Sequence, residues 1–241
     1  MDANLMTLVD VLVEAAAKSP VTEDGRRLPT ERELQAALGV SRQTVREQIA
    51  GLEILGLVNR TQGRGTYLET SPASFMHVYA ELALRIGFLD VEDLEEAREG
   101  LEFAAVISAV TRATAEDLAR LRGLVEKMAA ATAAGDDDGA ADADLEFHRE
   151  LYSISGQPLL DLFASGLSSA LRDLLRSRRA RVVTYERSHN HAETLRTDAV
   201  HAAIVEAIEG RDKQAALAAV TEHFSLWRTL SAEADSSPNS A

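Results

Sequence analysis

The stretch LPTERELQAALGVSRQTVRE, residues 28–47, decides the fold of the first part of the chain. Thr30 and Glu33 have the spacing of a capping box, which predicts that a helix starts at Thr30. Gly39 is typical of a helix end, and Ser41 is a favourable N-cap for a second helix that we expect to reach about Leu55. Two short capped helices separated by a three-residue break predict a helix-turn-helix.

The second of these helices has a polar face suited to DNA. Arg42 and Arg46 lie four residues apart and therefore share a face, with Gln43 and Thr44 beside them. A recognition helix presents such N-terminal polar residues to base edges, and Arg32 on the first helix is placed to touch the DNA backbone. The alternative is a solvated charged face. The opposite, apolar stripe consists of Val45, Ile49, Leu52 and Leu55.

A short hairpin is predicted to follow. Residues 57–60 and 66–69 are β-like runs around a tip in which Arg64 stands between Gly63 and Gly65. Such a tip forms a wing that inserts one cation into a groove of DNA. Before the helix pair, the apolar spacing predicts a helix over 5–17, and residues 21–27 are predicted to be a loop. The first 70 residues are thus interpreted as a winged helix-turn-helix domain, and 71–74 as a linker.

The distribution of charge supports this division. The 241-residue chain has a net charge of −14, which is unusual for a DNA-binding protein. Residues 26–66 contain seven arginines and four glutamates, a charge of +3, which leaves −17 for the rest. A short basic module attached to an acidic body is therefore predicted, and only that module needs to approach phosphate.

These motifs resemble the DNA-binding domain of GntR-family regulators, over residues 28–68. The matching stretches are Leu28–Leu34, Gly39–Glu47, Gly56–Val58 and Gly63–Thr66. The resemblance implies that the protein binds double-stranded DNA as a homodimer on a near-palindromic operator. The DNA contacts that it implies are Arg32, Arg42, Thr44, Arg46, Gly63 and Arg64, with Gln43 as a further candidate from its place on the helix.

The remainder of the chain is predicted to be all-helical, with seven helices at about 75–88, 92–112, 115–134, 138–154, 158–182, 190–209 and 212–231. Residues 232–241 contain no bulky apolar side chain and are predicted to be a disordered tail. The predicted fold is therefore mostly α, with a winged helix-turn-helix and a C-terminal seven-helix bundle over 75–231.

The composition of the chain limits the metal ligands it can offer and the compartment in which we expect it. The sequence has no cysteine, so any metal would be held by His, Asp or Glu. Charged residues interrupt the first 20 positions, and no uncharged apolar run reaches about 18 residues. We therefore expect a cytoplasmic protein that has no signal peptide and does not interact with a membrane.

Four polar residues fall on helix stripes that are otherwise apolar. Asp144 and His148 share one face, and His201 and His223 lie on the apolar faces of two later helices. Buried Asp and His side chains are costly without partners, so convergence on one cation would explain all four. Three imidazoles and a carboxylate suit Zn²⁺, with Ni²⁺ or Mn²⁺ as alternatives. For each histidine alone, a hydrogen bond to the backbone within the core is the competing explanation.

The helical half resembles the FCD sensor domain of the FadR subfamily, through Asp144–His148, Pro158–Leu160, and the separation of His201 from His223 by a helix, a turn and a helix. The resemblance implies a divalent ion on these Asp and His residues, with an effector carboxylate beside it.

Arginines are the candidates for binding the effector itself. Arg98 lies on an apolar stripe and would clamp a carboxylate, or else pair with Glu102 or Glu95. Arg172 is a weaker effector-binding candidate. His189 and His191 are alternative metal ligands whose role the sequence leaves open.

The sequence therefore predicts a DNA-binding transcription regulator, a repressor controlled by a small carboxylic acid bound next to a divalent metal, and not an enzyme. Three alternatives remain open at this level. They are a metal-dependent hydrolase, a regulator that responds to the metal itself, and a sensor of acyl-CoA.

Overall fold

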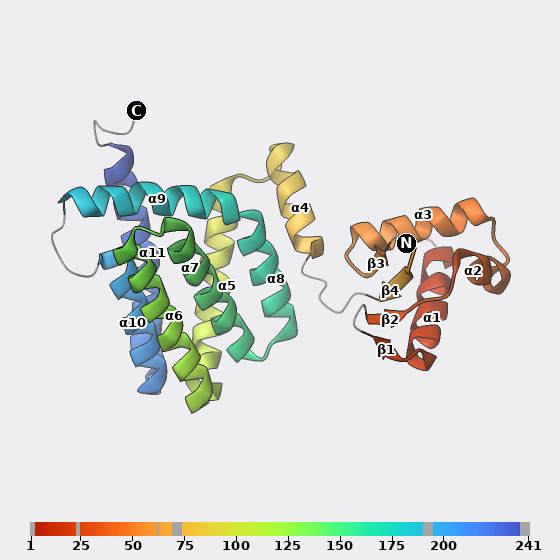
Figure 1. Ribbon diagram of the computed structural model, residues 1–241, viewed down its shortest axis with the longest axis horizontal. Helices are drawn as coiled ribbons and strands as arrows, with labels where there is room; N and C mark the ends of the chain where they lie inside the picture. The colour runs from red at the N-terminus through yellow and green to blue at the C-terminus, as the bar shows by residue number, and fades with distance from the viewer. Residues whose placement is uncertain (1–2, 23–24, 62, 69–73, 190–194, 237–241) are drawn as a thin grey trace. The chain divides into compact units, whose positions relative to one another are not determined.

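The computed structural model describes residues 3–22, 25–61, 63–68, 74–189 and 195–236. Contacts within the chain divide it into two compact units, Met1–Tyr79 and Ala80–Ala241, which are considered separately below. The first unit contains helices and a small sheet, and the described residues of the second unit form helices (Figure 1). The predicted fold class, a winged helix-turn-helix followed by an all-helical domain, is confirmed.

Helices α1 (Ala3–Lys18), α2 (Glu31–Leu38) and α3 (Arg42–Ile54) form the helical part of the first unit. Thr30 and Glu33 make the predicted capping box, Gly39 ends α2 with a φ of 67°, and the Ser41 side chain caps α3. Leu55 is the C-cap of α3 and is half-buried. The core of the unit consists of Leu8, Leu12, Ala16, Leu28, Leu34, Val45, Ile49, Leu52 and Val58.

The sheet of the first unit has four antiparallel strands in the order β1-β2-β4-β3. Strands β3 (Val58–Thr61) and β4 (Gly65–Leu68) form the predicted wing. The prediction of a loop over 21–27 is wrong, because β1 (Val21–Thr22) and β2 (Gly25–Arg27) extend the sheet. Arg26 and Arg27 pair with Leu68 and Tyr67 of β4, so a partner distant in sequence makes this polar segment a strand.

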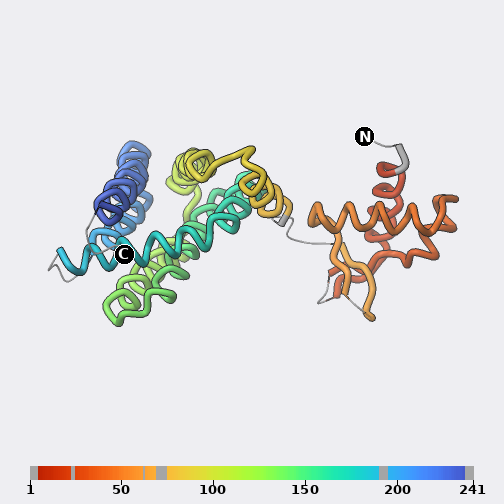
Figure 2. Tube along the Cα trace, turned by 90° about the horizontal axis from the view of Figure 1, so that it is seen from above, coloured from red at the N-terminus to blue at the C-terminus, as the bar shows by residue number. Residues whose placement is uncertain are grey.

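The described part of the second unit is built from helices only. They are α4 (Ser74–Arg85), which begins in the first unit, α5 (Val91–Arg112), α6 (Ala115–Ala134), α7 (Asp137–Ser155), α8 (Pro158–Ala170), α9 (Arg172–His189), α10 (Arg196–Glu209) and α11 (Lys213–Asp235). In Figure 1, α9 runs across the other helices, and both Figures 1 and 2 show α10 and α11 side by side. The main core lies among α5, α6, α7, α8, α10 and α11.

Several predicted helix limits differ from the structure, and the described residues form eight helices, α4 to α11, where seven were predicted. The helix predicted over 75–88 ends at Arg85, and the helix predicted over 190–209 begins at Arg196. The helix predicted over 158–182 is two helices, α8 and α9, which meet at the buried Leu171. Neither Gly nor Pro marks this break, so the sequence pattern predicts one continuous helix. The predicted tail is wrong in its first part, because α11 continues to Asp235 and buries Ala234 against Leu230 and Trp227.

Several segments fall outside the described residues. They include 71–73 of the predicted linker and 237–241 of the predicted tail. Ser74, the last residue of that predicted linker, is the first residue of α4. Among the residues that are described, no helix has both the length and the apolar character that a membrane crossing requires.

Candidate metal centre and nucleic-acid interface

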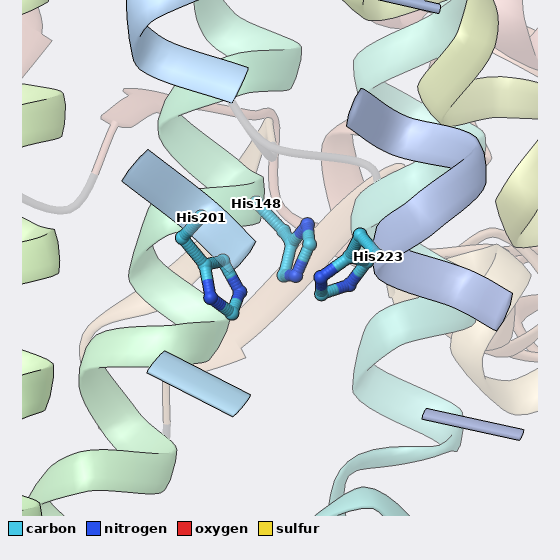
Figure 3. Close-up of side chains that lie close together, drawn as sticks. All are labelled: His148, His201 and His223. Carbon is cyan, nitrogen blue, oxygen red and sulfur yellow. The ribbon is translucent and has the colours of Figure 1, made fainter. Parts of the chain in front are cut away.

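Three histidines from three helices meet in the interior of the second unit. His148 on α7, His201 on α10 and His223 on α11 are 1%, 0% and 2% exposed. Figure 3 shows their rings gathered at one point between these helices. Each offers a ring nitrogen, and these nitrogens lie within 4.8 Å of one another, a spacing at which they could bind one ion.

Asp144 completes the group that the sequence predicted. Its Oδ1 atom lies 2.8 Å from Nε2 of His201 and 3.8 Å from Nε2 of His148, and its side chain is 15% exposed. Burial opposes ionisation of this carboxyl, but His201 and His148 beside it hold its pKa well below the usual value. The structure thus brings together all four predicted residues.

The residues of this group fit a metal ion, because most of their buried polar atoms have no hydrogen-bond partner outside the group. Nε2 of His148, Nδ1 of His201 and Nδ1 of His223 make no hydrogen bond among the described residues. Nδ1 of His148 and Nε2 of His201 face the carboxylates of Glu102 and Asp144 at 2.7 Å and 2.8 Å, without the geometry of a normal hydrogen bond. Buried polar atoms are nearly always satisfied in folded proteins, so this concentration is unusual. The hydrogen bond to the backbone that would explain each histidine separately is absent from the described contacts.

The protonation state of the imidazoles also suits metal binding. Burial lowers the pKa of His148, although Glu102 opposes the shift. Burial lowers the pKa of His223 further, and the neighbouring His201 and His148 act in the same direction. Both rings therefore favour the neutral form, which is the form that coordinates metal ions.

Glu102 on α5 also belongs to this site. The sequence analysis named it only as a possible partner of Arg98. It is fully buried, and its Oε1 atom lies 2.7 Å from Nδ1 of His148 and accepts a hydrogen bond from Tyr152 (2.8 Å). Arg98 Nη2 lies 3.1 Å from the same oxygen, so the ion pair considered as an alternative for Arg98 is present. Burial alone would raise the pKa of Glu102, but His148 and Arg98 hold it below its usual range. The only indication in the sequence is that Glu102 follows Arg98 by four residues, the spacing at which two side chains share a helix face.

A cavity of about 150 Å³ opens beside the histidines. Asp144, His223 and Arg98 line it together with the apolar side chains of Leu175, Phe224 and Trp227. One water needs roughly 10–15 Å³ of such space, so a small organic molecule has room here. Arg98 is 6% exposed, and its Nε atom has no hydrogen-bond partner among the described residues.

The second effector candidate lies elsewhere. Arg172 is the exposed first residue of α9 and does not line this cavity. Arg178, farther along α9, lines it instead and forms an ion pair with Glu95. Six residues of helix correspond to about 9 Å, the distance along α9 that separates Arg172 from the arginine lining the cavity.

Of the two alternative ligands, His189 is not part of the cluster. His189 is exposed and stacks on Tyr185, with ring centroids 4.3 Å apart. His191 lies outside the described residues.

In the first unit, the predicted DNA-reading side chains lie on an exposed face of α3. Arg42 and Arg46 have side chains that are 71% and 57% exposed. Both guanidinium groups approach Glu31 of α2, with Nε to carboxylate distances of 3.3 Å and 3.4 Å, and Arg60 of β3 approaches it to 4.0 Å. Exposed ion pairs of this kind contribute about 0–1 kcal/mol to the free energy of folding, so they orient the arginines but hold them only weakly.

The other predicted DNA contacts are also at the surface, apart from one. Arg32, Gln43, Gly63 and Arg64 are exposed, whereas Thr44 is half-buried. The Thr44 hydroxyl lies 2.8 Å from that of Ser41, so it takes part in the N-cap of α3. Gly63 adopts a φ of 76° at the wing, a left-handed conformation that favours glycine.

Comparison with known proteins supports both halves of the chain. Residues 12–68 match the family of bacterial regulatory proteins named gntR, and residues 93–226 match the FCD domain. The HTH-type transcriptional repressor NanR of Cronobacter sakazakii is 31% identical over 237 residues, covering 94% of this chain and 86% of NanR. The regulator LutR of Bacillus subtilis is 31% identical over 162 residues, 67% of this chain and 73% of LutR.

Solved structures agree at the level of the fold. GntR of Streptococcus agalactiae superposes with a TM-score of 0.65 at 24% identity, covering 94% of this chain and 98% of that protein. NanR and LutR carry the names of transcription regulators and not of enzymes. Because the DNA-binding and sensor halves match along most of their length, this chain belongs to the GntR family of bacterial transcription regulators and combines its DNA-binding domain with a metabolite-sensing FCD domain, consistent with the FadR subfamily.

Proposed function

We propose that this regulator is a repressor whose affinity for its operator is controlled by a small carboxylic acid bound next to a divalent metal ion. The observation that carries the proposal is the group of buried nitrogen and oxygen atoms of His148, His201, His223 and Asp144, which lie together beside a cavity without hydrogen bonds of normal geometry. The relative NanR is named a repressor, which favours the same direction of control here.

The four residues would hold Zn²⁺, with Ni²⁺ or Mn²⁺ as alternatives, and the ion would supply a positive charge for the carboxylate of the effector. Arg98, Arg178 and Arg228 line the same cavity and would add positive charge for the carboxylate. Three glutamates, Glu92, Glu95 and Glu96, also line it, and Glu95 pairs with Arg178. The apolar wall of Phe224 and Trp227 would pack against the carbon skeleton of the effector. A cavity of about 150 Å³ favours a small acid over a large acyl-CoA.

For the DNA-binding half, we propose a homodimer that presents two copies of α3 to a near-palindromic operator, because two-fold symmetry of the protein is mirrored in the site. Arg42, Arg46 and Arg32 would contact the DNA from α3 and α2, and Arg64 from the wing. An effector acts only through unequal affinity for the two conformations of the dimer, and a full switch needs a difference of about 10⁴-fold.

A thermal-shift screen of small carboxylic acids tests the sensor half. The acids are added to metal-loaded protein and to protein treated with a chelator, and the unfolding temperature is measured. The proposal expects at least one acid to raise the temperature in the metal-loaded protein alone. Stabilisation by zinc with no acid having any effect would favour a regulator that responds to the metal itself.

Two substitutions separate the functions of the halves. Arg42→Ala should abolish binding to an operator selected from random DNA and leave the response to acid intact. His148→Ala should remove the response to acid and leave DNA binding intact. An effector response that survives in His148→Ala would refute the role of the metal.

A further inference from the structure

We propose that Glu102 is the positioning residue that sets which nitrogen of His148 faces the metal ion, and that it joins the metal site to the effector cavity through Arg98. This inference rests on the proposed metal-dependent function. It assigns a task to a buried carboxylate that is not one of the proposed ligands.

The two nitrogens of His148 face different neighbours. Nδ1 lies 2.7 Å from Oε1 of Glu102, on the side of α5. Nε2 lies 3.8 Å from Oδ1 of Asp144, on the side of the histidine cluster. A proton held on Nδ1 by the Glu102 carboxylate leaves the lone pair on Nε2, which is the nitrogen that faces the other proposed ligands. Carboxylates that accept from the outer nitrogen of a metal-bound histidine fix its tautomer and raise its basicity.

Glu102 is itself held firmly in place. Tyr152 donates a hydrogen bond of 2.8 Å to Oε1, and Arg98 Nη2 lies 3.1 Å from the same atom. Both partners belong to the second unit, and Tyr152 is fully buried. The carboxylate is 0% exposed, so it does not face bulk solvent. A rigid acceptor of this kind can define the orientation of the His148 ring.

The same carboxylate reaches the effector cavity. Arg98 lies against Glu102 on one side and lines the cavity on the other. Its guanidinium packs near Phe224, with 5.4 Å from Cζ to the ring centroid. Glu102 thereby fixes a proposed metal ligand and the cation that would receive an effector carboxylate. Loss of Glu102 should therefore weaken the binding of metal and of acid together.

The test compares Glu102→Gln with Glu99→Gln in the full-length protein. Glu99 lies on the same helix and pairs with Arg228, so its substitution removes an equal charge without touching His148. The affinity for Zn²⁺ is measured by competition with a chromophoric chelator, and the absorption spectrum of the Co²⁺-loaded protein reports the geometry of the ligands. We expect Glu102→Gln to bind Zn²⁺ 10- to 100-fold more weakly with an altered Co²⁺ spectrum, the effect typical of such outer residues, and Glu99→Gln to match the wild type.

The double variant Arg98→Met/Glu102→Gln removes both buried charges, so it guards against misfolding of the single variant and should show the same loss. Zinc affinity and cobalt spectrum unchanged in a folded Glu102 variant would overturn the role of Glu102 and leave the proposed metal site standing. A wild-type protein that binds no Zn²⁺, Ni²⁺ or Mn²⁺ would overturn the metal site and this inference together.

Discussion

The substitution His223→Leu should reverse its effect on stability according to whether metal is present. His223 is 2% exposed, and its Nδ1 atom has no hydrogen-bond partner among the described residues. An unsatisfied buried polar group costs about 1–3 kcal/mol. Leucine removes that group and fills similar space at a packing cost of less than about 1.5 kcal/mol. In chelator, the variant should therefore be about as stable as the wild type or slightly more stable.

With zinc the order should change. At a zinc concentration of about 100 times the dissociation constant, binding stabilises the folded state by about 2.7 kcal/mol. The sensor unit, Ala80–Ala241, is of a size at which each kcal/mol shifts the unfolding temperature by about 2–4 °C. The wild type should then unfold about 5–11 °C higher with zinc. If loss of a ligand weakens binding by about 100-fold, the same zinc concentration stabilises His223→Leu by only about 0.4 kcal/mol.

Differential scanning calorimetry of both proteins, with chelator and with zinc, measures these four unfolding temperatures. His189→Ala is the matched control, because its imidazole is exposed and stacks on Tyr185 away from the cluster. It should keep the full zinc-dependent shift. The reasoning is refuted if His223→Leu keeps that shift, or if His189→Ala loses it.

Three further predictions concern the DNA-binding face, a helix cap and the cavity. Glu31→Gln removes the carboxylate that Arg42, Arg46 and Arg60 share, which leaves Arg42 and Arg46 without this ion pair and Arg60 with only Glu53. It should raise the affinity for random duplex DNA and steepen its dependence on salt by about 0.9 in log–log slope for each phosphate gained. Glu47→Gln, which changes the charge equally but pairs with Gln43, should do less, and equal effects would exclude a specific role for Glu31. Thr30→Ala removes the capping box of α2 and should cost about 1 kcal/mol in the free energy of unfolding of the first unit, measured with denaturant; an unchanged midpoint would contradict it. Arg178→Met should weaken the binding of an acid found in the thermal-shift screen by about 10- to 100-fold, which corresponds to one charge-assisted hydrogen bond. Titration calorimetry measures this affinity, and an unaltered value would show that the acid binds elsewhere.

Local patterns were sufficient to predict most of the helices and their limits. Thr30 with Glu33, Gly39 and Ser41 set helix ends through contacts within a few residues, so the sequence alone shows them. The inward faces of the later helices were equally readable, because a polar residue such as His201 interrupts a stripe with helical spacing. Each of these signals depends on neighbours along the chain.

Features that depend on distant neighbours could be known only from the tertiary structure. Strand β2 exists because Arg27 pairs with Tyr67, and no pattern in the sequence marks the break between α8 and α9 at the buried Leu171. Glu102 joins the site, and Arg178 replaces Arg172 beside the cavity, because of how α5 and α9 pack against α7 and α11. The physical reason is the distance along the sequence over which each interaction acts. Helix caps and helical periodicity depend on residues within about a turn, whereas the partner of a buried charge depends on which helix packs against it.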